Sequence, residues 1–439
     1  MGTNQTDMDK RVLNKIEELE KELVKVALDL GDIDASQPYE KEASDYVYEW
    51  LQANDFESTK LGTEERYNVL GKFAGTGKGR SLIFCSHLDN ENRENVERRL
   101  KDWDKPIYTK AWQEGETLVG HGIANDRGPM ACWMIATKAI KDSGIKLPGD
   151  VLMSAVIGET GGSPIDEFES PKYDSHELGA RYVATHGGLA DFAMIAEATA
   201  NTIVPVECGF AYFKVTVWAE PSSYTPFYPY PEPDMRKSVN SIVRMAKFIE
   251  RYQEYAYEYQ KKHTYSFDGG EVVPKTVIGA IRGGLPYLPH LTPEVCSVYI
   301  DFRTPPGKNP LELKRDLEGL LEEMEFDGKV ENYKFLPGYE AWKIEGFDKL
   351  KTALTESHLK VFEKSPPKNA VTYMLSMWRD INPYSELGVP SICYGFPTGY
   401  SAEGEKYDID LFRVKIKDMI DAAKVYALVA LDICNRKIN

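Results

Sequence analysis

Apolar residues recur every three or four positions in several segments of the chain, which is the period of an amphipathic helix. This spacing predicts helices over residues 16–30, 43–51, 129–140, 179–185, 239–261, 311–324, 350–362 and 409–434. In the first of these, Glu and Lys fill the other face, so we expect that face to lie in solvent. Pro129 stands near the first turn of its helix, where a missing N–H is harmless.

Short runs of mostly apolar residues lie between these helices. They predict strands over residues 67–73, 81–86, 151–158, 192–196, 212–218, 276–281, 295–302 and 390–394. The run over 81–86 is almost wholly apolar, as expected for a strand that is covered on both faces. Strands that alternate with helices predict an α/β domain with a mostly parallel sheet.

The pattern changes after Glu207. A smaller α+β insert follows, and the Pro- and Tyr-rich stretch over 221–233 at its entry predicts a loop or lid. Beyond the insert the chain returns to α/β patterning. We therefore predict a discontinuous first domain over 1–207 and 328–439, interrupted by a second domain over 208–327.

Composition narrows the class of protein. A chain of 439 residues with 42% hydrophobic residues is long enough for two cores. Its formal charge of −16 argues against nucleic acid or an anionic membrane as a partner, which leaves a small-molecule substrate. The six cysteines lack CxxC spacing, which predicts buried free thiols. The polar N-terminus and the lack of a run of about 20 apolar residues predict a cytoplasmic protein.

Four short motifs with acidic or histidine residues each follow an apolar run. They are Ser86-His87-Leu88-Asp89, Asn125-Asp126-Arg127-Gly128, Gly158-Glu159-Thr160-Gly161-Gly162 and Ala196-Glu197. Because binding sites in parallel sheets form at the carboxyl ends of the strands, we expect these motifs to lie together.

The residue types in these motifs point to a bound cation. His87 and Asp89 are two residues apart, so on an extended chain their side chains lie on the same side. The carboxylate can then interact with the imidazole and fix its orientation. Glu159 and Glu197 end apolar strands, where an unpaired buried charge is costly and a cation would offset it. Burial also raises the pKa of a carboxyl group, which suits Glu159 to act as a general base. Asp126, taken alone, also fits a helix N-cap.

The order of these motifs, followed by Gly283-Gly284 and Asp301-Phe302-Arg303, resembles the M20 metallopeptidase and amidohydrolase family. The resemblance implies that His87 and Glu197 bind a metal and that Asp126 is the carboxylate that usually bridges two metals. It implies that Glu159 deprotonates a metal-bound water and that Asp89 supports the ligands. It also identifies the two-part domain as catalytic and the insert as a lid and dimerisation domain, which implies a homodimer or a higher homo-oligomer.

The chain departs from the family pattern at the second metal. Thr160 stands where the family has a Glu ligand, and Ser401 stands where it has a His ligand. Both losses concern the same ion, so we expect one divalent transition metal per chain, Mn, Zn or Co. The lid segment over 220–226 also lacks the family's His, and the Asn that usually follows the Gly-Gly pair is missing. These losses make ordinary peptide hydrolysis doubtful.

Other side chains are candidates for binding the substrate in place of the lost groups. These are His186, Tyr224, His290, Arg379, Tyr400 and Ser401.

These observations leave three hypotheses for the function. The first is a metal-dependent hydrolase of a C–N bond in an N-acyl amino acid or a related small molecule. The second resembles a family branch with 5-nitroanthranilate aminohydrolase, which displaces ammonia from an aromatic amine. The third is an inactive ligand-binding member of the family. The presence of Glu159 argues against it, because a pure binding protein does not need an unpaired carboxylate at that position.

Overall fold

The computed structural model describes most of the chain, namely residues 2–90, 105–165, 174–176, 178–398 and 412–438. The chain divides into two compact units. Unit 1 comprises Met1–Pro205, Glu340–Val371 and Arg379–Asn439, and unit 2 comprises Val206–Tyr339 and Thr372–Trp378.

Unit 1 is built on a six-stranded sheet with the strand order β1-β2-β6-β3-β7-β16. The strands are β1 (Glu57–Gly62), β2 (Tyr67–Phe73), β6 (Val151–Val156), β3 (Leu82–His87), β7 (Phe192–Ile195) and β16 (Ser391–Cys393). β6, β3, β7 and β16 run parallel, whereas β2 pairs antiparallel with β6 and with β1. Every residue of β3 is buried, which confirms the prediction that this strand is covered on both faces.

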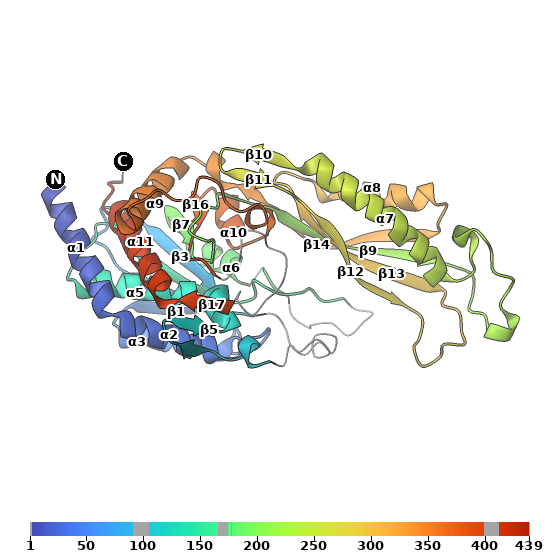
Figure 1. The fold of residues 1–439 in the computed structure, drawn as a ribbon, viewed down its shortest axis with the longest axis horizontal. Coiled ribbons are helices and arrows are strands. Elements are labelled where there is room, and N and C mark those ends of the chain that lie inside the picture. Colours follow the sequence, from blue (N-terminus) through green and yellow to red (C-terminus); the bar gives the residue numbers. More distant parts are fainter. Residues whose placement is uncertain (1, 91–104, 166–173, 177, 399–411, 439) are drawn as a thin grey trace. The chain divides into compact units, whose positions relative to one another are not determined.

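Helices surround this sheet, as Figure 1 shows. They are α1 (Gly2–Glu18), α2 (Glu20–Asp32), α3 (Lys41–Ala53), α5 (Gly128–Asp142), α6 (Ala180–Thr185), α9 (Phe347–Phe362), α10 (Ile381–Glu386) and α11 (Ile416–Cys434). α5 and α11 pack on each other and on β3, and α6 and α10 contact each other and the neighbouring strands. A small sheet in the order β17-β5-β4 completes the unit, with strands β4 (Trp112–Glu114), β5 (Thr117–Val119) and β17 (Arg413–Lys415).

Unit 2 is an antiparallel four-stranded sheet in the order β12-β13-β9-β14, with two long helices. Its elements are β9 (Gly209–Trp218), α7 (Ser241–His263), β12 (Thr276–Gly283), β13 (Val295–Thr304), α8 (Pro310–Glu323) and β14 (Gly328–Leu336). Two short pairs accompany them, β8 (Val206–Glu207) with β15 (Tyr339–Glu340) and β10 (Tyr265–Phe267) with β11 (Gly270–Val272). Asn240 and Asn309 begin the two helices, since each side chain accepts a hydrogen bond from the backbone N–H two residues later.

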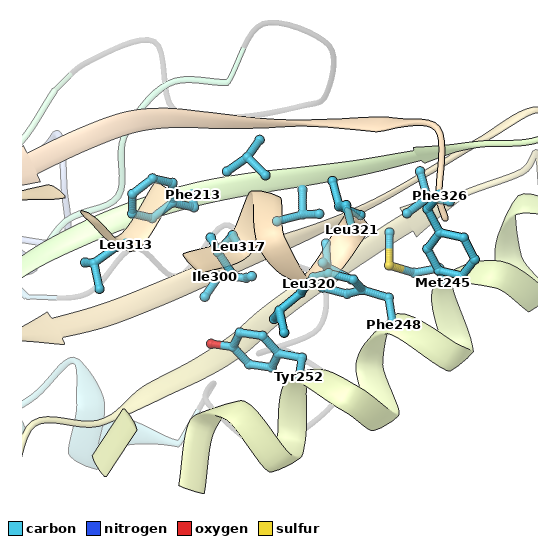
Figure 2. Close-up of a cluster of buried hydrophobic side chains, with 14 of the residues drawn as sticks. Phe213, Met245, Phe248, Tyr252, Ile300, Leu313, Leu317, Leu320, Leu321 and Phe326 are labelled. Carbon is cyan, nitrogen blue, oxygen red and sulfur yellow. The ribbon is translucent and has the colours of Figure 1, made fainter. Parts of the chain in front are cut away.

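Helices α7 and α8 cover one face of this sheet, and Figure 2 shows the side chains between them. Phe248 and Tyr252 come from α7, Leu317 from α8, and Phe213 and Ile300 from the sheet. All five are buried, so this unit has a hydrophobic core of its own.

Several predictions about the elements need correction. The first helix is interrupted at Leu19, so α1 and α2 are separate. The last helix begins at Ile416 rather than at residue 409, and β17 precedes it. Strand β14 pairs with β9, so unit 2 extends to Tyr339 and the predicted boundary at residue 327 falls too early. The sequence of β14 is rich in polar residues because about half of its positions are partly exposed.

The mostly parallel sheet and the α+β insert are confirmed. The six cysteines are free and buried, as predicted. Within the described part of the chain, no helix is both long and apolar enough to span a membrane.

Candidate active site

Three of the four motifs follow the carboxyl ends of neighbouring strands in unit 1. β3 lies between β6 and β7, and all three run parallel, with His87 opposite Val156 and Cys85 opposite Ile195. His87 ends β3, Glu159 follows β6 and Glu197 follows β7. The strand order of the sheet places these three strands side by side, and Figure 1 labels β3 and β7 among them. The predicted convergence at one edge of the sheet therefore follows from the parallel pairing.

Asp126 reaches this edge from the turn before α5. The turn over Ile123–Arg127 is π-helical, Asn125 departs from helical backbone angles, and the Asn125–Asp126 peptide bond is cis. The carboxylate of Asp126 is fully buried, and its Oδ2 accepts a hydrogen bond from the backbone N–H of His87 at 3.3 Å. Asp126 thus lies beside His87 at this edge of the sheet and is not a solvent-exposed helix cap.

The imidazole of His87 is buried and held by its own turn. Nδ1 lies 3.0 Å from the carbonyl oxygen of Asp89 and 3.8 Å from the carboxylate Oδ1 of Asp89. If the proton of the neutral ring is on Nδ1, where the carbonyl can accept it, the lone pair is on Nε2. Nε2 lies 3.1 Å from the side-chain oxygen of Asn125 and 3.8 Å from a carboxylate oxygen of Glu159. The nitrogen that carries the lone pair therefore faces the acidic cluster.

The Asp89 carboxylate is saturated with hydrogen bonds. It accepts from the backbone N–H groups of Glu159 at 2.9 Å and Thr160 at 2.8 Å, and from the hydroxyl of Thr160 at 2.7 Å. The side-chain amide of Gln37 donates a fourth bond at 2.6 Å. Burial alone would raise the pKa of Asp89, but the nearby His87 and these donors outweigh burial and lower the pKa. Asp89 is therefore a stable anion within the protein.

Three other carboxyl groups of the cluster behave in the opposite way. Burial raises the pKa of Asp126, Glu159 and Asp380 well above the ordinary range, and repulsion between the acids adds to the effect. Glu197 contributes to this repulsion at all three. Oδ1 of Asp126 and Oδ2 of Asp380 are buried and have no hydrogen-bond partner among the described residues. The cluster therefore holds more negative charge than its neighbours offset.

Arg379 supplies part of the missing positive charge. Its guanidinium forms an ion pair with the carboxylate of Glu197, and both side chains are almost completely buried. Arg379 also lowers the pKa of Glu159, although burial and the acids outweigh this effect. Arg379 thus pairs with one member of a group of five buried or nearly buried carboxyl groups, namely Asp89, Asp126, Glu159, Glu197 and Asp380.

The chemistry of this donor set fits a divalent cation. The unpartnered Oδ1 of Asp126, the mutual repulsion of the acids and the lone pair of His87 are features that a metal ion would satisfy. In the described ranges, no group of three or more His, Cys, Asp or Glu side chains is placed so that it could hold a metal ion as it stands. The fit thus rests on charge and donor type.

The remaining predicted residues lie elsewhere or outside the described ranges. His186 is exposed and stacks on the ring of Tyr182 at 3.8 Å. Tyr224 and His290 meet in unit 2 with ring centroids 5.6 Å apart. Tyr400 and Ser401 belong to the residues that the structure does not describe. A role in substrate binding for these five residues and for Arg379 stays a prediction.

The sequence reasoning missed a second set of polar residues that supports the site. Glu40 is fully buried and forms an ion pair with Arg66 at 2.6 Å. The side chain of Asn90 donates to the carbonyl of Asn125 at 2.9 Å, and Arg127 donates to Asn90 and to the carbonyls of two residues in the last turn and at the end of α2. These residues lie far apart in the sequence, and none belongs to a recurring pattern. Their proximity to the motifs could have raised attention only for Asn90 and Arg127.

Comparison with known proteins places this fold. No family model matches the chain. A curated relative, the N-formyl-4-amino-5-aminomethyl-2-methylpyrimidine deformylase of Bacillus subtilis, is 24% identical over 393 residues, which cover 84% of each protein. Human carnosine dipeptidase 1 superposes with a TM-score of 0.67 at 14% identity, covering 97% of this chain and 99% of that one.

A third match names the fold family. The Bacillus subtilis YXEP protein, described as a dinuclear metal-binding peptidase of the M20 family, superposes with a TM-score of 0.61 at 13% identity, covering 94% of this chain and 98% of that one. The chain therefore has the fold of the M20 metallopeptidases, with a large, mostly parallel sheet in one unit and an antiparallel sheet with two helices in the other.

Proposed function

We propose that this protein is a metal-dependent hydrolase that cleaves the amide C–N bond of a small N-acylated amine, with one divalent transition metal bound by His87, Asp126 and Glu197. The observation that carries the proposal is the buried acidic cluster at the ends of three parallel strands, in which the carboxylate of Asp126 has an unpartnered oxygen. A cation would satisfy that oxygen and remove the repulsion between the acids.

The residues of the site divide the chemical work between them. When bound, a divalent metal polarises the scissile carbonyl and lowers the pKa of a coordinated water. Glu159 accepts the proton of the attacking water and returns it to the leaving amine, because its carboxyl lies at the cluster edge with a raised pKa. Asp89 holds the imidazole of His87 in one tautomer.

A single metal is supported by the side chain at position 160. Where the M20 resemblance implies a carboxylate ligand for a second ion, Thr160 offers a hydroxyl, and that hydroxyl donates to Asp89. Arg379 lies at Glu197 as a fixed cation of the protein itself. Because the site contains a guanidinium and lacks one carboxylate, it has less negative charge for a second metal ion to neutralise.

The deformylase relative favours an amide as the bond that is cleaved. Its name describes removal of a formyl group from an aminopyrimidine, and the match spans 84% of both chains. This supports amide hydrolysis over displacement of ammonia from an aromatic ring. We extend the proposal to unit 2 as a lid and dimerisation domain.

A substrate panel tests the proposal. The full chain is freed of metal with a chelator, reloaded with Mn, Zn or Co, and assayed with N-formyl amines, N-acetyl amino acids, dipeptides and aminobenzoates. We expect amine release from an N-formyl or N-acetyl compound, about one tight metal per chain, and loss of activity after chelation. The matched control His87→Gln should lose both the metal and the activity.

Other results would contradict the proposal in distinguishable ways. Ammonia release from an aminobenzoate with no amide cleavage would favour the aromatic aminohydrolase. Two tight metals per chain would reject the single-metal site. A chain that binds none of the three metals would favour the inactive ligand-binding protein.

A further inference from the structure

The Asp89 carboxylate joins the two halves of the candidate site. Its Oδ1 accepts the N–H of Glu159 and lies 3.8 Å from Nδ1 of His87. Its Oδ2 accepts three further hydrogen bonds, from the backbone N–H of Thr160, the hydroxyl of Thr160 and the amide of Gln37. Asp89 thus contacts the imidazole of the candidate metal ligand through its backbone carbonyl, at 3.0 Å from Nδ1, and holds the turn that carries the candidate base through its carboxylate.

Gln37 reaches Asp89 from a different part of the chain. Its side chain is 1% exposed, and its backbone N–H donates to the carbonyl of Asn90 at 3.3 Å. The N–H of Asn90 in turn donates to Ala35 at 3.0 Å, so the segment after α2 runs along the His87–Asn90 turn. The side-chain amide is therefore delivered to Asp89 by backbone pairing and not by chance contact on the surface.

Gly161 leaves the space that this amide needs. A Cβ atom at position 161 would lie 1.9 Å from the side-chain oxygen of Gln37 and 2.6 Å from Ser175. Because Gln37 is buried, its amide cannot move aside into solvent. A side chain at position 161 would therefore clash with Gln37, which explains why the residue after Thr160 is a glycine.

We propose that Thr160 and Gln37 form a clamp on Asp89 and act as positioning residues for His87 and Glu159. The single proton of the Thr160 hydroxyl is donated to Asp89, so this side chain helps to hold the Asp89 carboxylate in place. Hydrogen bonds to a charged acceptor are shorter and stronger than neutral ones, which fits the distances of 2.6–2.8 Å on Oδ2. The consequence for metal binding rests on the proposed function, whereas the clamp itself does not.

Two variants of Thr160 separate its hydroxyl from its shape. Thr160→Val keeps the branched shape and lacks the hydroxyl, whereas Thr160→Ser keeps the hydroxyl. For each full-length variant, Mn²⁺ affinity is measured by competition with a chelator. Hydrogen exchange of the peptide that contains the Glu159 and Thr160 amides is measured in the metal-free protein. We expect about tenfold weaker Mn²⁺ binding and faster exchange for the Val variant. The Ser variant should restore both.

Gln37 provides an independent arm of the test. Gln37→Leu removes the fourth donor, and Gly161→Ala pushes the amide of Gln37 away from Asp89. Both should weaken Mn²⁺ binding in the same direction as Thr160→Val. The double variant with Val at 160 and Leu at 37 should show coupling, because both side chains act on the same oxygen.

The outcomes decide the clamp and the proposed function separately. If Thr160→Val matches the wild type in both Mn²⁺ affinity and exchange, or if Thr160→Ser fails to restore them, the clamp is rejected. If the wild type binds no Mn²⁺, Zn²⁺ or Co²⁺, the proposed function fails. The clamp is then judged on exchange alone, and faster exchange in the Val variant than in the Ser variant supports it, whereas equal exchange overturns it.

Discussion

Two buried aspartates of the same site, Asp89 and Asp126, are in opposite electrostatic states. Both side chains are fully buried. Asp89 accepts four hydrogen bonds and has a lowered pKa, whereas Asp126 has an unpartnered oxygen and a pKa raised by burial and by Glu197. The protein thus supplies hydrogen-bond donors to both oxygens of Asp89, whereas Asp126 would be stabilised by an external cation.

This difference separates support from ligation. A carboxylate whose oxygens all hold donors fixes its neighbours, because any movement would break several bonds at once. A buried carboxylate with a free oxygen is costly until a cation binds. The following variants change one side of this comparison at a time.

The largest expected effect concerns Glu159, whose backbone N–H bonds Asp89 and whose carboxyl belongs to the repelling group. Glu159→Gln keeps the shape and the backbone bond but removes the proton acceptor. We expect turnover of the panel's best substrate to fall by about 10² to 10⁴-fold. Metal content, measured by elemental analysis, should not fall. A variant with full activity would remove Glu159 from its proposed role.

The next effect concerns the cation that the protein itself provides. Arg379→Met leaves the buried Glu197 carboxylate without its ion-pair partner. We expect the free energy of unfolding of the metal-free protein, from urea titration, to fall by about 3 kcal/mol. Added Mn²⁺ should recover part of this loss.

Arg80→Met is the matched control for this variant. Arg80 pairs with Asp191 at 2.6 Å, but both side chains are about 30% exposed. Its loss should therefore cost less than about 1 kcal/mol and should not respond to Mn²⁺. Equal losses for the two variants would show that the Glu197 pair is an ordinary surface-like pair.

A pair of amide substitutions tests the two aspartates directly. Asp89→Asn replaces an acceptor by an NH₂ group beside existing donors, so we expect metal-free stability to fall by about 1–3 kcal/mol. Asp126→Asn replaces a carboxyl group whose ionisation is opposed by burial and by Glu197, so the metal-free protein should be as stable as the wild type or more stable. Urea titration gives both values. The comparison fails if Asp126→Asn is the more destabilising of the two.

A further effect, which needs no substitution, is a pH dependence with a defined sign. The raised pKa values of Asp126, Glu159 and Asp380 mean that the folded protein holds protons that the unfolded chain has already released. Their contribution to stability is present below the ordinary carboxyl pKa of about 4 and is lost as pH rises through the folded values, by at most about 1.4 kcal/mol per pH unit for each proton.

A bound cation reverses this loss, because it favours the ionised acids. The difference in Tm between Mn²⁺-loaded and metal-free protein should therefore grow from about pH 5 to about pH 8. Calorimetric scans across this range measure it. Asp126→Asn should show a weaker dependence, and a constant difference in the wild type would contradict the assigned pKa directions.

The sequence by itself determined the elements and their polarity. The apolar runs that end at His87, before Glu159 and before Glu197 are the strands β3, β6 and β7, and their parallel pairing brings the three motifs to one edge. Such patterns are local, since burial on both faces requires an apolar run wherever it occurs. The polar strand β14 shows where this reading fails, because a half-exposed strand carries a weaker signal.

Only the tertiary structure decided which side chains form hydrogen bonds and ion pairs with one another. The spacing of the motifs gives no sign that Gln37 donates to a carboxylate 52 residues away, or that Arg379 lies on Glu197. It also marks Thr160 merely as a lost ligand, whereas the structure gives its hydroxyl a partner. The physical reason is that hydrogen bonds and ion pairs act over a few ångströms, so they depend on how distant segments pack and not on their order along the chain.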